Sequence, residues 1–398
     1  MNQSLLFTVI VSVSLFLNGC ATSTEPSAAA TEKESVKKDV DSAAVKPSQP
    51  VSKPTVKQAK PVKPTATVEE TLVEPPLTGS YVDYPQAKEF IAEMSAEGFS
   101  EAYLKEVLGE AKRQQSILKA ISRPAEKSLT WGEYRKIFIQ DKRIKQGVQF
   151  WQENQEALTR AEQTYGVPAE VIVSIIGVET RYGRIMGSYR VLDAVATLGF
   201  DYPRRSAFFL GQLKEYLRLV KEEGTDITAH KGSYAGAMGF GQFIPSSYRS
   251  FAVDFDNDGK RDIWNNKTDA IGSVANYFAK HGWAAGEAVI SGVSFNKPTD
   301  ESWFSQGRAG LIPELTIADW QQRGVEPELT LSPEGKAILM RLKMGEDEQY
   351  WLGLHNFYVI TRYNHSKLYA MAVHRLSEQV KMAYEKATPV EPTVKNKK

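Results

Sequence analysis

The sequence predicts an α+β protein that is mainly α-helical, preceded by an export signal and a long polar segment. Apolar residues recur at helical spacing over most of residues 81–387, and strand-like stretches are few and short. Between residues 21 and 80 large apolar side chains are almost absent. The chain has 398 residues, 42% of them hydrophobic and 24% charged, which suffices for one large domain with sub-lobes or for two ordinary domains.

The composition excludes several classes of function. The formal net charge is +1, which gives no global electrostatic argument for binding nucleic acid, although it leaves a local basic groove open. Cys20 is the only cysteine, so neither an intramolecular disulfide nor a Cys/His metal site can form. There are five histidines and no GxSxG motif, which disfavours a Ser–His–Asp or Cys–His mechanism.

The chain begins with an apolar run from Leu5 to Leu17, which predicts a signal peptide over residues 1–19. The run is too short for a membrane-spanning helix, which needs roughly 20 residues. It ends in the tetrapeptide Leu17-Asn18-Gly19-Cys20, which resembles a bacterial lipobox. That resemblance implies a lipidated Cys20, and Ala21 after it resembles an outer-membrane address. The alternative is a non-lipidated signal peptide with an incidental cysteine.

Residues 20–80 are rich in Pro, Lys and Thr and predict a disordered tether that follows the lipidated cysteine. Such a composition cannot bury enough apolar surface to offset its chain entropy. A flexible coil of this length has an end-to-end distance of roughly 40–45 Å. Its lysines are expected to solvate the segment. Residues 388–398 are predicted to be a flexible tail behind the folded body of residues 81–387.

Start and stop signals place the helices of the body in order. One helix starts at Pro85 and stops at Gly98, and Ser100 caps the next. A single helix is expected from Gly147 to Gly166. Further helices are expected from a Ser206 cap to Gly224, from an Asp269 cap to Gly282, and over residues 366–386. Strands are expected near residues 288–295 and 328–331.

A helix from Ala169 to Thr180 carries an unusual carboxylate, that of Glu179. Pro168 suits the first turn of this helix, and Gly183 is expected to end it. Glu179 follows Ile175 by four residues, so it shares the apolar face at the C-terminal end. Burial and the helix dipole both raise the pKa of a carboxyl group there, which suits a general acid. A structural pair with Arg181 or Arg184 is the alternative, and spacing alone does not decide.

Four long segments resemble the lytic murein transglycosylase B family: GVETRYG (177–183), SYAGAMGFGQFIPSSY (233–248), DFDNDGKRDIWNN (254–266) and FYVITRYNHSKLYAMAV (357–373). The resemblance implies a lysozyme-like catalytic core with a helical lobe and a small β-containing lobe carrying an EF-hand-like loop, around a deep groove. It implies cleavage, without water, of the β-1,4 bond between N-acetylmuramic acid and N-acetylglucosamine. Glu179 would be first acid and then base, and the products would be 1,6-anhydromuramyl ends. No cofactor would be required for the chemistry.

The same resemblance implies groove residues. Ser233 and Gln242 match positions that hydrogen-bond near the catalytic sugars, and Asn364 matches a sugar-contacting amide. Arg204 and Arg205 match positions that meet the acidic stem peptide, since guanidinium groups pair well with carboxylates. Aromatic groove positions are matched by Tyr134, Tyr277, Tyr363 and Tyr369. The alternatives are a glycine-rich connector without a ligand, tyrosines that only pack in the core, and a solvated arginine pair.

An aspartate-rich segment resembles an EF-hand loop at positions 1, 3, 5, 6 and 9, which are Asp254, Asp256, Asp258, Gly259 and Asp262. Lys260 at position 7 would offer its carbonyl. Asn265 stands at position 12 in place of glutamate, and the family resemblance moves the last carboxylate to Asp269. We expect a structural Ca²⁺, or Na⁺, held by Asp254, Asp256, Asp258, Lys260 and Asp269. The alternatives are a simple Asp/Gly turn and an Asp269 that only caps a helix.

The expected partners follow from this hypothesis. They are peptidoglycan glycan strands and stem peptides, the outer membrane through the lipid anchor, and proteins of cell-wall synthesis or hydrolysis. A monomer at the periplasmic face of the outer membrane is expected, with no nucleic-acid partner. Competing hypotheses are a hydrolytic muramidase on the same fold, a non-catalytic murein-binding lipoprotein and a calcium sensor.

Overall fold

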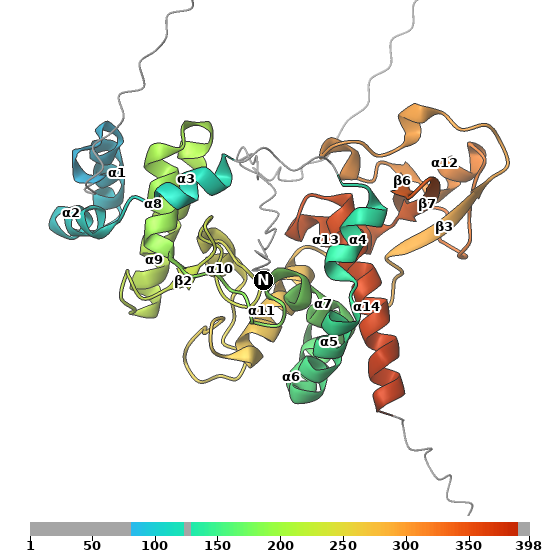
Figure 1. Cartoon of the computed structure of the whole chain (residues 1–398), viewed down its shortest axis with the longest axis horizontal. Helices are drawn as coiled ribbons and strands as arrows, with labels where there is room; N and C mark the ends of the chain where they lie inside the picture. The colour runs from blue at the N-terminus through green and yellow to red at the C-terminus, as the bar shows by residue number, and fades with distance from the viewer. Residues whose placement is uncertain (1–80, 123–128, 389–398) are drawn as a thin grey trace, which may run out of the picture. The chain divides into compact units, whose positions relative to one another are not determined.

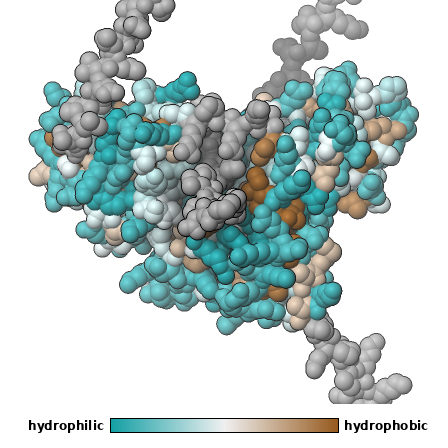
Figure 2. Space-filling view, viewed as in Figure 1, coloured by the Kyte–Doolittle hydropathy of each residue, from teal (hydrophilic) through white to brown (hydrophobic). Residues whose placement is uncertain are grey.

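The computed structural model describes residues 81–122 and 129–388, which form a mainly helical body with small antiparallel sheets (Figure 1). The predicted signal peptide, Cys20, the tether and residues 389–398 of the tail lie outside these residues. Within the described ranges, no helix combines the length and apolar character needed to cross a bilayer. Figure 2 shows that hydrophilic residues prevail over this face, as expected for the outer sides of amphipathic helices.

The N-terminal helices pack with α8 and α9 around one hydrophobic cluster. The predicted helix start at Pro85 is confirmed. The predicted Ser100 cap is also confirmed, because the Ser100 hydroxyl accepts the Tyr103 N–H at 3.2 Å. Ser206 does not cap α9, since its hydroxyl donates to the Gly199 carbonyl. The elements are η1 (Tyr81–Asp83), α1 (Pro85–Ala96), α2 (Glu101–Glu110), α3 (Gln115–Ile121), α8 (Val191–Asp201), η2 (Pro203–Arg205) and α9 (Ser206–Glu223).

A second cluster surrounds α7, which packs against α5, α6, α11 and α14. The single helix expected from Gly147 to Gly166 is wrong, because Asn154 interrupts it and separates α5 from α6. The predicted bounds of α7 are confirmed. So is the prediction that the preceding helix ends at Gly166. The elements are α4 (Trp131–Phe138), α5 (Asp141–Glu153), α6 (Gln155–Tyr165), α7 (Ala169–Thr180), α10 (Pro245–Phe251), α11 (Lys267–Lys280), α13 (His355–Tyr363) and α14 (Lys367–Ala387).

A five-stranded antiparallel sheet has the order β4-β6-β7-β3-β5 and carries α12 (Ile317–Gln322). The strand near residues 288–295 is confirmed as β3, but residues 328–331 are not a strand. The β6–β7 hairpin was missed, and it pairs Leu339 with Leu352 in the core of the sheet. The strands are β3 (Ile290–Phe295), β4 (Leu315–Thr316), β5 (Val325–Pro327), β6 (Lys336–Met344) and β7 (Asp347–Gly353), with β1 (Tyr189–Arg190) and β2 (Lys231–Gly232) forming a separate pair.

The aspartate-rich loop connects α10 to α11 and is not part of the five-stranded sheet. The loop lies against the separate strand pair, because the Trp264 indole N–H donates to the Lys231 carbonyl of β2 at 3.0 Å. Asp269 is not the cap of α11. Asn266 takes that place, because its side-chain oxygen accepts the N–H groups of Thr268 and Asp269. The fold class itself, mainly helical with a small sheet, is confirmed.

Candidate active site

Glu179 stands in the last turn of α7, where the chain reverses sharply. Pro168 is the N-cap of this helix, one place before the predicted first-turn position. The helix stops at Thr180, and Arg181, Tyr182 and Gly183 follow with φ of 52°, 60° and 80°. Gly183 is thus the third left-handed residue of the reversal. The Thr180 hydroxyl donates to the Phe240 carbonyl at 2.9 Å, which ties the helix end to the glycine-rich loop.

The Glu179 carboxyl group is half-buried, and burial raises its pKa to about 7. One hydrogen bond opposes that shift, because the Tyr369 hydroxyl donates to Glu179 Oε1 at 2.6 Å. Neither predicted arginine pairs with it. Arg181 Nε donates to the Gln146 side chain at 2.9 Å, and Arg184 reaches the Arg181 carbonyl. A carboxyl group with this pKa is protonated in part at neutral pH and can act as acid and as base.

Tyrosines from α11, α13 and α14 form a wall beside Glu179. The rings of Tyr277 and Tyr363 have centroids 4.7 Å apart. The Tyr363 hydroxyl donates to the Gly241 carbonyl at 2.5 Å, and the Tyr277 hydroxyl donates to the Arg362 carbonyl at 2.6 Å. Burial, and then the charge of Glu179, raise the pKa of Tyr363 and of Tyr369. These tyrosines therefore lie within electrostatic reach of the carboxyl group and stay neutral beside it.

Two further predicted groove residues border this wall. Asn364 is buried and follows the last residue of α13 directly, next to Tyr363. Tyr134 on α4 is buried, and it is among the groups that raise the pKa of Tyr369, after burial and the charge of Glu179. The structure thus brings four predicted tyrosines and one amide to the neighbourhood of Glu179.

The glycine-rich loop holds Ser233 and Gln242 through internal hydrogen bonds. The Ser233 hydroxyl accepts the N–H groups of Ala235 at 3.3 Å and Ala237 at 3.1 Å. Gln242 has a positive φ of 53°, and its amide nitrogen donates to the carbonyls of Met186 and Gly239. Both side chains are buried, so they shape the loop that approaches Glu179 through Phe240 and Gly241.

The two predicted arginines lie in η2, ahead of α9. Arg204 is exposed to solvent. The Arg205 guanidinium lies 3.9 Å from the centroid of the Phe208 ring, and burial lowers its pKa. A guanidinium can both stack on an aromatic ring and pair with a carboxylate. The predicted contact of this pair with the stem peptide stays a prediction.

The aspartate-rich loop brings four carboxylates close together. The carboxylate oxygens of Asp254, Asp256, Asp258 and Asp269 lie within 4.8 Å of one another. Asp269 is buried and accepts the N–H groups of Phe255 at 2.7 Å and Asp262 at 2.9 Å. In the described part of the chain, no lysine or arginine forms an ion pair with these four carboxylates. An all-oxygen set with this negative charge suits a hard cation.

Two other predicted members of the loop contribute differently. The Lys260 N–H donates to Asp258 Oδ1 at 2.9 Å, which closes the turn after Gly259. The Asp262 carboxylate accepts the N–H groups of Trp264 and Asn265 and is not among the four clustered carboxylates. Burial, and the charges of Asp256 and Asp254, raise the pKa of Asp269. A bound cation would relieve this repulsion.

Sequence reasoning missed the residues that join the catalytic helix to its surroundings. Thr180 and Phe240 bond to each other, and Gly241 accepts the Tyr363 hydroxyl. All three lie inside the motifs that carried the resemblance, directly beside predicted residues. Their position next to predicted residues was the only signal that could have identified them. A sequence pattern does not show which backbone carbonyl accepts a hydrogen bond.

Replacing Tyr369 by Phe is expected to shift the alkaline limb of the activity–pH profile upward by about one pH unit. The Tyr369 hydroxyl stabilises the ionised carboxylate, so its loss raises the pKa of Glu179 above about 7. A general acid must be protonated, and the variant therefore keeps its proton to higher pH. Rate against pH on isolated sacculi measures the limb. Tyr384→Phe on the same helix is the control, and an unmoved limb in Tyr369→Phe would refute the coupling.

Comparison with known proteins agrees with this geometry. The Transglycosylase SLT domain family model matches residues 83–378. The membrane-bound lytic murein transglycosylase B of Escherichia coli (strain K12) is 44% identical over 315 residues, which cover 77% of this chain and 85% of that relative.

Two solved structures resemble the fold. The Escherichia coli lytic transglycosylase Slt35 in complex with calcium is 44% identical with a TM-score of 0.70, covering 77% of this chain and 96% of that one. SltB3 from Pseudomonas aeruginosa in complex with NAG-anhNAM-pentapeptide is 30% identical with a TM-score of 0.66, covering 74% and 78%.

The lysozyme-like, mainly helical fold that this chain shares with these relatives defines an enzyme of the lytic transglycosylase class. The match over residues 83–378 and the 44% identity make the assignment specific. The chain belongs to the Transglycosylase SLT domain family. The resemblance noted in the sequence is thereby confirmed.

Proposed function

We propose that this chain cleaves the β-1,4 bond between N-acetylmuramic acid and N-acetylglucosamine in peptidoglycan, with Glu179 as the single acid and base. The supporting observation is the isolation of this carboxyl group. Only burial and the Tyr369 hydrogen bond shift its pKa. A glycosidase partner carboxylate would stand within about 5–10 Å and raise that pKa by its charge.

The reaction then proceeds in two proton transfers. Protonated Glu179 gives its proton to the glycosidic oxygen as the bond from that oxygen to muramyl C1 breaks. The ionised carboxylate next takes the proton of the 6-hydroxyl of the same muramyl residue as that oxygen bonds to C1. Glu179 ends in its starting state, and the product carries a 1,6-anhydro ring. An internal nucleophile needs orientation and exclusion of water rather than a second carboxylate.

The buried wall and loop suit that requirement. We assign sugar contacts to Ser233, Gln242, Asn364 and the tyrosines 134, 277, 363 and 369. A tyrosine offers a flat apolar face with a polar tip, which suits a sugar ring. Arg204 and Arg205 would meet carboxylates of the stem peptide. The pentapeptide ligand of SltB3 makes a peptide-bearing substrate reasonable for this chain as well.

Mass spectrometry of digested sacculi tests the proposed reaction directly. Muropeptides ending in 1,6-anhydromuramic acid, each lighter than its hydrolysed counterpart by one water, are the expected products. Reducing ends alone would contradict the proposal and favour the hydrolytic muramidase. No release of soluble fragments at all would favour a non-catalytic binding protein.

We also propose that the aspartate-rich loop holds a structural Ca²⁺, with Na⁺ as the weaker ligand. Asp254, Asp256, Asp258 and Asp269 would supply carboxylate oxygens, and Lys260 its carbonyl. The calcium complex of Slt35 supports the choice of ion. The ion would neutralise the clustered carboxylates and fix the start of α11, without taking part in proton transfer.

Calcium at one hundred times its dissociation constant is expected to stabilise the fold by about 2.7 kcal/mol. The melting temperature should therefore rise by about 5 °C over that in EDTA, measured by differential scanning calorimetry. Asp254→Asn should abolish most of that difference, whereas Asp226→Asn, on an exposed turn outside the cluster, should preserve it. A melting temperature that changes with neither EDTA nor calcium would contradict the proposed calcium site.

For the residues outside the structure, we propose the organisation that the sequence predicts. A signal peptide over 1–19 would expose Cys20 for lipidation, and a tether over 20–80 would connect it to the catalytic domain of residues 81–387 and the tail of 388–398. The enzyme would then act from the periplasmic face of the outer membrane. The membrane-bound naming of the Escherichia coli relative supports an anchored form.

A further inference from the structure

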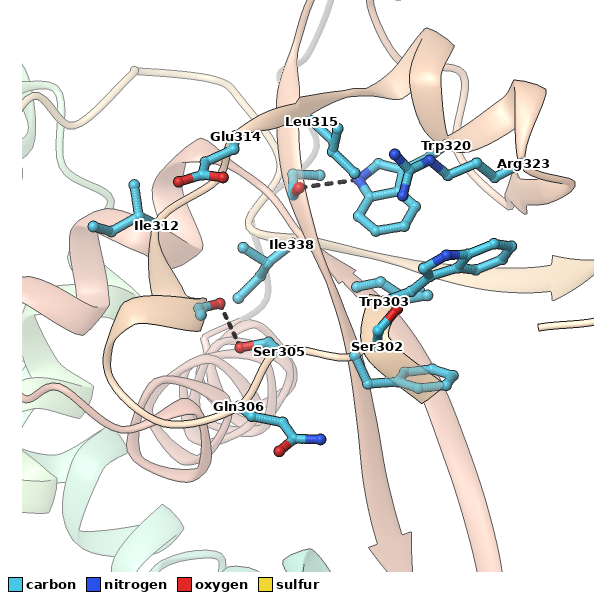
Figure 3. A pocket seen from close by; sticks show the side chains of 14 residues that line it. Ser302, Trp303, Ser305, Gln306, Ile312, Glu314, Leu315, Trp320, Arg323 and Ile338 are labelled. Atoms are coloured by element: carbon cyan, nitrogen blue, oxygen red, sulfur yellow. Dashed lines mark hydrogen bonds between the residues drawn. The ribbon is translucent and has the colours of Figure 1, made fainter. Parts of the chain in front are cut away.

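A pocket of about 590 Å³ opens in the sheet-bearing part of the chain, and none of the predicted groove residues lines it (Figure 3). Its walls come from two short 3-10 helices, η3 (Glu301–Trp303) and η4 (Ala309–Leu311), and from β4, α12 and β6. The volume is in the range of pockets that bind small molecules or short peptides. Nothing in the proposed reaction uses this pocket.

One side of the pocket is aromatic and carries a positive charge. The rings of Trp303 and Trp320 lie edge to face with centroids 6.5 Å apart. The Arg323 guanidinium lies 5.8 Å from the Trp303 ring centroid and 5.4 Å from that of Trp320. The Trp320 indole N–H donates to the Ala337 carbonyl at 3.0 Å, which locks this ring in place. The arginine is thus held on a rigid aromatic surface.

The opposite side of the pocket carries a negative charge. Figure 3 shows Glu314 across the pocket from Arg323, with Ile338 between them. In the described part of the chain, neither side chain forms an ion pair or a hydrogen bond. The Asp319 carboxylate is already bound to the Thr316 N–H and hydroxyl, and these hydrogen bonds, followed by the charge of Arg323, lower its pKa. Both charges in the pocket are therefore available to a ligand.

We propose that this pocket is a second binding site for peptidoglycan and takes the stem peptide. Arg323 would bind a peptide carboxylate, Glu314 would bind the free side-chain amine of the peptide, and Trp303 and Ile338 would pack against its apolar parts. A neutral sugar has no charges to match this pair. The inference rests on the proposed function in one respect, since it takes peptidoglycan as the substrate. A second site on the same polymer raises the effective concentration of glycan strand at the groove.

Titration of ¹⁵N-tryptophan-labelled full chain with a synthetic stem pentapeptide tests the proposal. The chain carries Glu179→Gln so that no step of the reaction intervenes, and Trp303→Phe assigns one indole resonance. The peptide is expected to shift the indole N–H resonances of Trp303 and Trp320. Arg323→Glu and Glu314→Lys should each weaken binding at these reporters at least tenfold. Lys343→Glu on β6 reverses an exposed charge outside the pocket and should bind normally.

Unchanged indole resonances at millimolar peptide would overturn the proposal. So would shifts that the Arg323 and Glu314 variants leave unaffected, or shifts caused by the peptide-free disaccharide instead. In active enzyme, Arg323→Glu should reduce cleavage of intact sacculi several-fold but not cleavage of peptide-free glycan strands. If the pocket did not bind the stem peptide, cleavage and the formation of anhydro products would still be observed. Failure of the proposed reaction would show in the products while the peptide titration still reported on the pocket.

Discussion

Glu179→Gln is expected to lower the rate of sacculus cleavage by about 10³- to 10⁴-fold, because both proton transfers pass through this one carboxyl group. The amide keeps the size of the side chain and can still accept the Tyr369 hydrogen bond, so substrate binding should change little. The expected loss is therefore in kcat rather than KM. Release of soluble muropeptides from isolated sacculi measures it.

The matched control for this change is Glu170→Gln in the first turn of the same helix. Glu170 forms an ion pair with Lys381 at 2.8 Å and lies at the other end of α7. Losing such a pair near the surface costs about 1 kcal/mol or less, and activity should persist. Comparable loss of activity in both variants would mean that the helix, and not the proton donor, had been damaged.

The sign of the pH dependence of stability gives a second readout for Glu179→Gln. Burial raises the pKa of Glu179 from 4.5 to about 7, so the folded state binds more protons than the unfolded state between these values. Stability from this group is therefore lost as pH rises through that window. The glutamine variant should melt at the same or a higher temperature than the parent at pH 8. That difference should close at pH 5. A variant that melts lower at both pH values would argue for a structural role.

Gly187→Ala is expected to destabilise the fold by about 3 kcal/mol or more. Gly187 has φ of 91°, which disfavours any side chain, and an added Cβ would overlap the backbone carbonyl of Gly232. Backbone on both sides leaves no flexible neighbour to move away. The strand pair of Tyr189 with Gly232 and the adjoining Ser233 loop would be displaced, so activity should fall as well.

Gly98→Ala separates the two causes of that destabilisation. Gly98 has φ of 87°, almost the same as Gly187, but an added Cβ there meets no atom within 4 Å. It should cost about 1–2 kcal/mol from backbone conformation alone. Denaturant unfolding of the two variants compares them. If Gly187→Ala were no worse than Gly98→Ala, the close approach of the two backbones would be refuted.

Local signals predicted the helices well where a cap or a glycine marked the end. The bounds of α7 were predicted because Pro168 precedes it and apolar residues make up most of it. The break at Asn154 was missed, since the apolar period continues across it and nothing nearby is a strong helix breaker. The β6–β7 hairpin was missed because residues 336–344 are long and apolar enough to resemble a helix segment.

The sequence could predict which residues belong to the candidate site, but not which contacts they form. Helix phase marked Glu179 as unusual, and the motifs supplied its partners. No sequence pattern could show that Tyr369 donates to its carboxyl group or that Arg181 turns away to Gln146. Those outcomes depend on how α14 and α5 pack against α7, which is set by tertiary contacts across the core. The pocket at Trp303 and Arg323 left no signal for the same reason.

The hydrogen bond between Tyr369 and Glu179 has a consequence for the order of folding. Its two residues are 190 positions apart, and Tyr369 belongs to the last helix of the described chain. Contacts this remote form late, since closing so long a loop is entropically unfavourable until other elements have packed. A chain lacking its final helix would hold Glu179 without its phenol partner, and only Tyr277 and Tyr363 of the tyrosine wall would remain. We therefore expect the hydrogen bond at Glu179 to form only after α14 has packed against α7.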